Sequence, residues 1–284
     1  MLGRLGYYIS SIPTLLAGLR NWPEVVVRSA GILGAKHWVV TLRDGSRFHV
    51  RSAMDVWVVK ETCLDRQYER ESVQIENGWT VLDIGAALGD FSICVARRNP
   101  NCLVYAYEPF PESFDLLQLN IKLNKIQNVR AFPYAVGARD GAAFLRVSSK
   151  EAVRHSTVTG QVDGKNAVAV EAVSLNEVFV QNGIVTCDYL KADCEGAEYD
   201  ILLNAGAAVL NRIRYICIEY HDGVTPFSHD DLLRHLKNNG FDVKSTRNPV
   251  HSGLGFLYAA NRGLPGHSST CHSSAPRAKG PPAE

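Results

Sequence analysis

The sequence predicts an α/β protein in which a parallel sheet is flanked by helices and the last strand is antiparallel. Three observations support this fold class. From Trp79 onward, apolar runs of strand length alternate with helical patterns, as in βαβ units. A tight turn with two glycines joins the first of these strands to the following helix. Two β-like runs near the end, at 241–245 and 255–260, favour a closing hairpin.

Composition limits the size, location and partners of the protein. The 284 residues are 46% hydrophobic, which is enough for the core of a sheet covered on both faces. The formal net charge is +1 without a lysine- or arginine-rich block, so a nucleic-acid partner is disfavoured. The 7 cysteines include no C-x-x-C pair, and several lie in apolar runs, where free cysteine packs as a small hydrophobe. This usage favours a reducing, cytoplasmic location over a secreted disulfide scaffold.

Residues 1–75 are predicted to form an N-terminal extension of helices and a hairpin. The apolar stretch 5–19 is interrupted by Pro13 and is shorter than the ~20 residues of a membrane span. We expect an amphipathic helix that packs on the main domain, with a peripheral membrane contact as the less favoured alternative. Asp44-Gly45 predicts a hairpin turn between two short β-like runs, and a helix follows. The runs are 38–42 and 47–50, and the helix is 56–68.

The main domain, 76–262, opens with the strongest functional signal in the chain. An apolar run at 80–84 enters a tight turn and then a helical pattern at 91–97. A helix N-terminus offers free N–H groups, and glycine lets a backbone approach a ligand closely. The next strand ends at Glu108-Pro109, where a carboxylate suits the hydroxyls of a nucleotide ribose. We therefore predict a nucleoside-containing cofactor, held at this turn by Asp83, Gly85, Ala86 and Gly89 and at the second strand by Glu108 and Pro109.

The details of the turn argue against a dinucleotide. In the G-x-G-x-x-G fingerprint the second glycine admits the pyrophosphate, but Ala87 stands there, and Asp90 replaces the third glycine. Asp83 also places a negative charge beside the turn. S-adenosylmethionine suits these residues better, with its ribose at Glu108 and its methionine amine and carboxylate at the turn. In the alternative interpretation, the two glycines serve only a tight turn.

The alternation of strands and helices continues to the end of the main domain. Helices are predicted from Pro111, at 196–204 and at 232–238, and strands at 128–136, 143–147, 167–173, 188–193 and 213–219. The polar segment 148–166 is expected to be an inserted loop that covers the site as a lid. Five parallel strands with a terminal hairpin are typical of the Rossmann-like class I methyltransferases. Residues 263–284, rich in Gly, Ser, Pro and Ala, predict a disordered tail.

Polar residues gather at the predicted carboxyl ends of the strands, where open α/β sheets bind ligands. The backbone amides of Ala135 and Val136 are expected to meet the adenine. Asp193, at the end of the fourth strand, is expected beside the transferring methyl group, although it is also a plausible N-cap. His221 and Asp193 are the first candidates to accept a hydroxyl proton, and Glu219 and Lys191 come next.

Several of these residues have structural alternatives. Lys191 lies on the same strand face as Asp193, and a buried ion pair is its favoured role over acid–base catalysis. Glu195 and Glu198 are expected to stabilise a helix N-terminus. His221 is equally consistent with an ordinary surface histidine. No histidine or carboxylate spacing predicts a metal site.

The chain resembles the FkbM-type family of S-adenosylmethionine-dependent methyltransferases over about residues 40–260. The most specific stretch is Leu-Lys-Ala-Asp-Cys-Glu-Gly-Ala-Glu at 190–198. The other matching segments are 81–86, 107–109, 113–114, 119–120 and 135–137, with Asp55, Glu61 and Tyr68 upstream. Cys194 stands where this family usually has an aliphatic residue, and Ala87 stands where it usually has Asn. The resemblance implies O-methylation of a sugar or polyketide hydroxyl.

The sequence thus predicts an S-adenosylmethionine-dependent O-methyltransferase that acts on a small-molecule hydroxyl. A nucleic-acid methyltransferase is one alternative, but the chain lacks an N-P-P-Y-type loop and a basic surface. A non-catalytic module that binds the cofactor is the other alternative.

Overall fold

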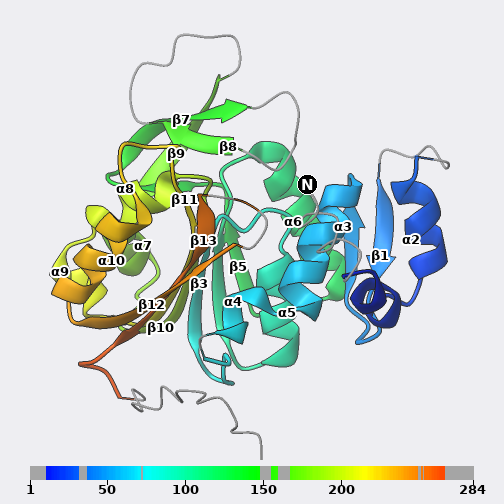
Figure 1. The fold of residues 1–284 in the computed structure, drawn as a ribbon, viewed down its shortest axis with the longest axis horizontal. Coiled ribbons are helices and arrows are strands. Elements are labelled where there is room, and N and C mark those ends of the chain that lie inside the picture. The colour runs from blue at the N-terminus through cyan, green and yellow to red at the C-terminus, as the bar shows by residue number, and fades with distance from the viewer. Residues whose placement is uncertain are drawn as a thin grey trace, which may run out of the picture.

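A seven-stranded sheet forms the centre of the protein (Figure 1). The computed structural model describes residues 11–31, 37–71, 73–147, 155–158, 167–248, 251 and 253–265. In spatial order the strands are β12 (Phe241–Arg247), β13 (Leu254–Asn261), β11 (Ile213–His221), β10 (Cys187–Ala192), β3 (Thr80–Ile84), β4 (Leu103–Tyr107) and β5 (Val129–Phe132). Within this seven-stranded sheet, β13 pairs antiparallel with both of its neighbours, and all the other neighbouring strands are parallel. The predicted class I methyltransferase fold, with its antiparallel last strand, is confirmed.

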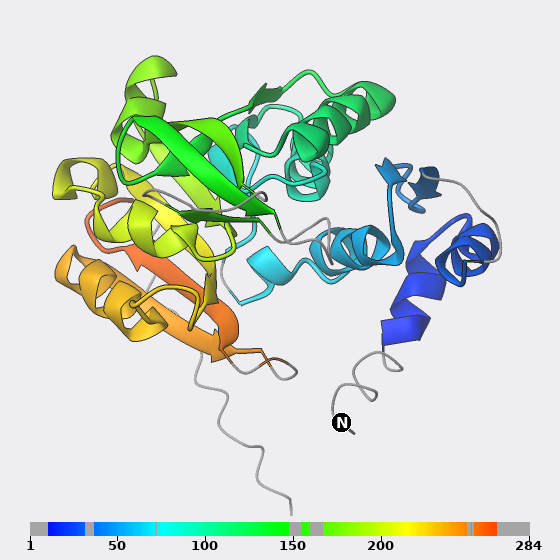
Figure 2. The same ribbon diagram turned by 90° about the horizontal axis from the view of Figure 1, so that it is seen from above.

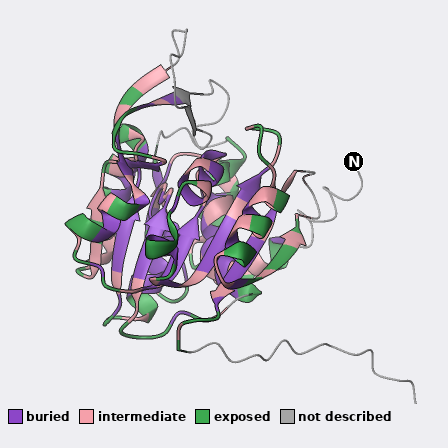
Figure 3. Cartoon of the chain, turned by 90° about the vertical axis from the view of Figure 1, so that its left-hand side faces the viewer, coloured by how far each residue is buried: buried purple, intermediate pink, exposed green. Residues whose placement is uncertain are grey.

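Helices cover both faces of this sheet, which explains the continuous apolar runs of its strands. On one face, side chains of β3 and β10 pack with α7 (Leu175–Gln181), α8 (Ala197–Leu203), α9 (Ala207–Leu210) and α10 (His229–Asn238). On the other face they pack with α5 (Asp90–Arg98). Figure 3 shows the buried strands between half-buried and exposed helical surfaces. α7 and α9, which are short and lie close to strands, were not predicted from the sequence.

The N-terminal extension docks on one side of the main domain (Figures 1 and 2). Its elements are a helix at 11–18, α2 (Trp22–Ser29), β1 (Trp38–Thr41), β2 (Arg47–Val50), α3 (Ala53–Val59), the π-helix η1 (Lys60–Leu64) and α4 (Gln67–Arg70). The predicted hairpin is confirmed as β1–β2. Asn120 on α6 (Pro111–Asn124) accepts from the His49 backbone N–H at 2.7 Å and ties the hairpin to the domain.

The helix predicted at 56–68 is broken into three pieces. Arg66 adopts a left-handed backbone with φ 52°, which ends one segment and caps α4. A residue with a left-handed backbone cannot continue a right-handed helix. The residues around Arg66 include no glycine, so nothing in the local sequence signals this break. Leu15 and Leu19 pack in the same hydrophobic cluster as Ile93, as expected for a helix on the domain. No helix in the described ranges is long and apolar enough to span a membrane.

The third predicted strand, 128–136, divides between two sheets. β5 stops at Phe132, and Ala135 begins β6 (Ala135–Gly137) in a four-stranded sheet of order β6-β9-β7-β8. Pro133 lies at the break, because proline cannot donate a ladder hydrogen bond. The other strands of this sheet are β7 (Gly141–Val147), β8 (His155–Val158) and β9 (Ala167–Ser174). β8 falls within the segment expected to be a lid, whose remaining residues, like most of the predicted tail, lie outside the described residues.

A disulfide between Cys63 and Cys94 corrects the expectation that the cysteines are free. Cys63 lies on η1 in the extension and Cys94 on α5 in the main domain, 31 positions apart in sequence. The sequence offered no C-x-x-C signal, because two segments distant in the chain are brought together only by docking of the extension.

Candidate functional site

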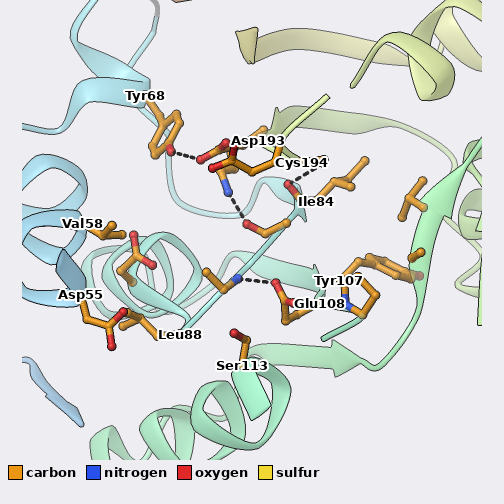
Figure 4. Close-up of a pocket in the computed structure, with 18 of the residues that line it drawn as sticks. Asp55, Val58, Tyr68, Ile84, Leu88, Tyr107, Glu108, Ser113, Asp193 and Cys194 are labelled. Atoms are coloured by element: carbon orange, nitrogen blue, oxygen red, sulfur yellow. Dashed lines mark hydrogen bonds between the residues drawn. The ribbon is translucent and has the colours of Figure 1, made fainter. Parts of the chain in front are cut away.

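A cavity opens at the carboxyl ends of β3, β4 and β10, at the edge where the sequence placed the site (Figure 4). One side is built by the sheet and the other by the N-terminal extension. The lining residues that the sequence singled out as ligands are Gly85, Glu108, Pro109, Ala135, Val136, Lys191 and Asp193. Asp83, Ala86, Gly89, Glu219 and His221 were also singled out, but they do not line the cavity.

Glu108 occupies the position expected for a ribose-binding carboxylate. Its Oε2 accepts from the Ala87 N–H at 2.8 Å and its Oε1 from the Phe110 N–H at 2.9 Å, so the side chain is fixed in the cavity wall. Burial raises the pKa of Glu108 to about 7, against the opposing effect of these two backbone donors. Each carboxylate oxygen can accept more than one hydrogen bond. Glu108 therefore fits a ribose diol of S-adenosylmethionine.

The backbone of the turn after β3 is not arranged to hold a phosphate. The N–H groups of Gly85 and Ala86 both donate to the Tyr107 carbonyl, and the Gly89 N–H donates to the Ala86 carbonyl. With Ala87 bonded to Glu108, these four donors are used within the protein. Phosphate sites depend on N–H groups directed at the ligand. The geometry agrees with the argument against a dinucleotide.

Packing requires both glycines of the turn, and Gly85 also lines the cavity. A Cβ on Gly85 would lie 1.9 Å from the Asp193 carbonyl oxygen, and one on Gly89 would lie 2.5 Å from Leu117. Both glycines also have positive φ, at 77° and 89°. Gly85 lets the ends of β3 and β10 approach, and this approach brings Asp193 into the cavity.

Asp83, which the sequence predicted beside the methionine moiety of the cofactor, does not line the cavity. Its side chain is fully buried, with Oδ1 3.0 Å from Lys191 Nζ and Oδ2 accepting from the Ser92 hydroxyl at 2.6 Å. Lys191 Nζ also donates to the Gly85 carbonyl at 2.6 Å. Burial lowers the pKa of Lys191, but the nearby carboxylates outweigh it and the net shift is upward. Lys191 thus remains protonated, as expected for an ion pair and not for a base.

Asp193 directs its carboxylate into the cavity from the end of β10 (Figure 4). Its Oδ2 accepts from the Tyr68 hydroxyl at 2.7 Å. Glu219 lies behind this pair, with its Oε2 3.4 Å from the same hydroxyl. Burial raises the pKa of Glu219 well above its usual range, and the charge of Asp193 adds to the effect. A protonated Glu219 cannot accept a proton, so Asp193 is the better candidate of the two.

The prediction that His221 accepts the hydroxyl proton requires a neutral imidazole at the rim of the sheet. The structure contradicts this. His221 is 5% exposed, with Nδ1 3.0 Å from Glu198 and Nε2 3.4 Å from Glu195. Burial lowers the pKa of His221, but the hydrogen bond and charge of Glu198 and the charges of Asp193 and Glu195 outweigh this and raise it to about 10. An imidazolium cannot act as a base at neutral pH. His221 instead ties the end of β11 to the first turn of α8.

Apolar residues form part of the cavity lining, as a purine needs. They are Pro109, Ala135 and Val136, together with Tyr107. Tyr107 stacks on Phe132 with ring centroids 4.8 Å apart, which fixes this wall. The placement agrees with adenine binding, although Ala135 and Val136 belong to a different sheet from the one predicted.

Several lining residues were not predicted as ligands. Arg51 and Val58 have no motif around them, Ser113 lies in a segment of the resemblance but was given no role, and Asp90 was considered only as a missing glycine. Arg51 pairs with Asp55 through Nε at 3.1 Å and donates to the Ser113 hydroxyl at 3.2 Å. Asp55 and Ser113 both belong to the pattern of the resemblance, and this was the signal that could have pointed to their shared partner.

Asp90 adds a further carboxylate to the cavity lining, which also includes Glu108 and Asp193. It is 5% exposed, and burial raises its pKa to about 6, although the charge of Lys191 opposes this. In the described part of the chain, no group of three or more His, Cys, Asp and Glu side chains is arranged to hold a metal ion.

The chain is similar to known methyltransferases. Residues 83–243 match the model of the methyltransferase FkbM domain. The chain is 24% identical over 242 residues to the 31-O-demethyl-FK506 methyltransferase FkbM of Streptomyces tacrolimicus, covering 75% of this chain and 92% of that protein. It is 23% identical over 228 residues to the hexuronic acid methyltransferase AglP of Haloferax volcanii, covering 78% of this chain and 88% of that one.

A third relative is a much larger protein. The chain is 26% identical over 234 residues to the AMB antimetabolite synthetase AmbE of Pseudomonas aeruginosa. The match covers 69% of this chain but 11% of AmbE.

Proposed function

This chain belongs to the FkbM family of methyltransferases and uses S-adenosylmethionine as its cofactor; from this premise we propose that it methylates a hydroxyl oxygen of a sugar, a polyketide or another small molecule. The Asp193 carboxylate, held in the cavity at the end of β10, is the observation that carries the proposal. One relative is named for methylation of 31-O-demethyl-FK506, which supports a hydroxyl acceptor. Another is named as a hexuronic acid methyltransferase, which supports an oxygen acceptor on a sugar acid, either a hydroxyl or the carboxylate.

In the proposed mechanism, the protein aligns the acceptor and removes its proton. The bound cofactor supplies an electrophilic methyl group on a sulfonium. Glu108 would hold the ribose of the cofactor, and the apolar wall at Val136 would hold its adenine. Asp193 would accept the proton of the acceptor hydroxyl, whose oxygen would take the methyl group that the cofactor supplies. Alignment of three atoms in a line supplies much of the rate, and a positioned base adds roughly 10²–10⁴-fold.

Transfer from labelled S-adenosylmethionine to a panel of sugars, glycosides and polyketides tests the acceptor class. We expect label in an ether, identified by mass spectrometry and by its stability to mild acid and base. Label in an amine, or transfer to transfer RNA in place of small molecules, would overturn the hydroxyl acceptor. Cofactor binding without transfer to any acceptor would favour the non-catalytic alternative.

Substitution of two carboxylates that line the cavity tests the base. Asp193→Asn keeps the shape of the side chain, and kcat is expected to fall by about 10²–10⁴-fold with little change in cofactor Kd. Asp90→Asn is the comparison variant, because Asp90 lines the same cavity but is buried, whereas Asp193 is half-buried. A large loss of kcat in Asp90→Asn with near-normal kcat in Asp193→Asn would transfer the role to Asp90.

A further inference from the structure

Tyr68 links the N-terminal extension to the proposed base. It lies on α4, 125 positions before Asp193, and its side chain is 4% exposed. Its hydroxyl is 2.7 Å from Asp193 Oδ2 and 3.4 Å from Glu219 Oε2. A residue from the extension thus reaches the end of the central sheet, where it contacts a carboxylate that lines the cavity.

The ring of Tyr68 is held on several sides, so its hydroxyl has a fixed position. Phe91 and Phe256 make edge-to-face contacts with centroid distances of 5.5 and 5.8 Å. The Tyr189 hydroxyl donates to the Tyr68 carbonyl. A side chain that is already immobilised by packing loses little further entropy when it forms a hydrogen bond.

The direction of the hydrogen bond follows from the surrounding charges. Burial raises the pKa of Tyr68 well above its usual value, and the charge of Asp193 adds to this. The phenol therefore keeps its proton, and its O–H donates a hydrogen bond to the Asp193 carboxylate. Such charge-assisted bonds are shorter and stronger than neutral ones.

We propose that Tyr68 is a positioning residue whose hydroxyl holds the Asp193 carboxylate in the orientation that receives the acceptor's proton. This rests on the proposed function, because it assumes that Asp193 is the base. Tyr68 keeps its own proton throughout and does not touch the reacting atoms. The docked extension is then a condition for a correctly oriented base, in addition to forming one wall of the cavity.

Tyr68→Phe tests the proposal while keeping the ring and its packing. We expect kcat to fall by about 10- to 100-fold, the range for a displaced catalytic group, with an unchanged Kd for S-adenosylhomocysteine. The acid limb of the kcat/KM profile should move to higher pH, because a carboxylate that loses a donated hydrogen bond is protonated more readily. The control is Tyr258→Phe, which removes a hydroxyl bonded to Gln67 and should retain parental kcat and the parental pH profile.

A readout independent of turnover comes from the carboxyl-carbon NMR signal of Asp193, assigned by its absence in Asp193→Asn. Its titration should move to higher pH in Tyr68→Phe and remain in place in Tyr258→Phe. In a double-mutant cycle, adding Tyr68→Phe to Asp193→Asn should cause little further loss of kcat.

The failure of this inference is distinct from failure of the proposed function. If Asp193→Asn lowers kcat strongly while Tyr68→Phe has parental kcat, pH profile and NMR titration, the positioning role is refuted and the base is retained. If Asp193→Asn itself has parental kcat, the assignment of the base is wrong, and the positioning role falls with it.

Discussion

The two walls of the cavity are built in different ways. The sheet wall comprises the carboxyl ends of β3, β4 and β10 with Gly85, Glu108 and Asp193, and its geometry follows from strand register. The extension wall comprises Arg51, Asp55, Val58 and Tyr68, and its geometry follows from docking of the N-terminal extension. Cofactor-binding chemistry therefore lies in a locally coded framework, while the orientation of the proposed base depends on a contact between distant segments.

Each wall contains a buried ion pair. The pair in the sheet wall is set by strand register, and the pair in the extension wall is linked to docking of the extension. Lys191 and Asp83 are register partners on adjacent parallel strands, so sheet formation alone places them together. Arg51 and Asp55 are four residues apart at the start of α3, but Arg51 also reaches Ser113 on α6. The first pair stabilises the sheet, and the second helps to fix the extension against it.

Lys191→Met should have the largest effect on stability, because it leaves the fully buried Asp83 without its cation. Removing one partner of a buried pair costs about 3–5 kcal/mol of unfolding free energy. Lys244→Met is the control, since Lys244 pairs with Glu71 at the surface and should contribute about 0–1 kcal/mol. Urea unfolding of both variants gives the comparison. Equal losses would show that the sheet wall does not depend on its buried pair.

Loss of the Cys63–Cys94 disulfide should loosen the extension from the sheet wall. Replacing both cysteines with alanine is expected to lower the unfolding free energy by about 2–4 kcal/mol. Adding a dithiol reductant should destabilise the parent by a similar amount and leave the double variant unchanged. Alkylation of both thiols in the folded parent without reductant would contradict the prediction.

Glu108→Gln should weaken S-adenosylhomocysteine binding by about 1.5–3 kcal/mol, the range for hydrogen bonds to a charged group. The pKa of Glu108 is raised to about 7, so the carboxylate is ionised only above that pH. Parental affinity should therefore rise from about pH 6 to about pH 8 relative to that of the variant, because an ionised carboxylate is the better acceptor. Calorimetry at both pH values measures this. Parallel pH dependences in the two proteins would exclude Glu108 as the ribose ligand.

His221→Gln should have the smallest effect, about 1–3 kcal/mol, because it removes the cation that partners the buried Glu198. The folded-state pKa of His221 is raised from 6.5 to about 10. Its contribution to stability is thus fully present below about pH 6.5 and is lost as the pH rises through about 10. Urea unfolding at several pH values should show the difference from the parent shrinking with increasing pH. A difference that grows with pH would contradict the protonated state.

Local sequence was sufficient for the sheet and for the residues at strand ends. Glu108 and Asp193 were predicted from position alone, because parallel strands place their carboxyl ends at one edge. The same reasoning went wrong for Asp83 and His221, which also stand at strand ends. Whether such a residue faces a cavity or a buried partner depends on neighbouring strands and helices, here Lys191 and Glu198.

By itself, the sequence determined the α/β fold and the hairpin of the extension, since each depends on residues close together in the chain. Only the tertiary structure decided that Tyr68 meets Asp193, that Cys63 meets Cys94, and that the turn glycines fill packing roles. Long-range docking sets these contacts through burial and close packing, and no spacing pattern within the chain encodes them.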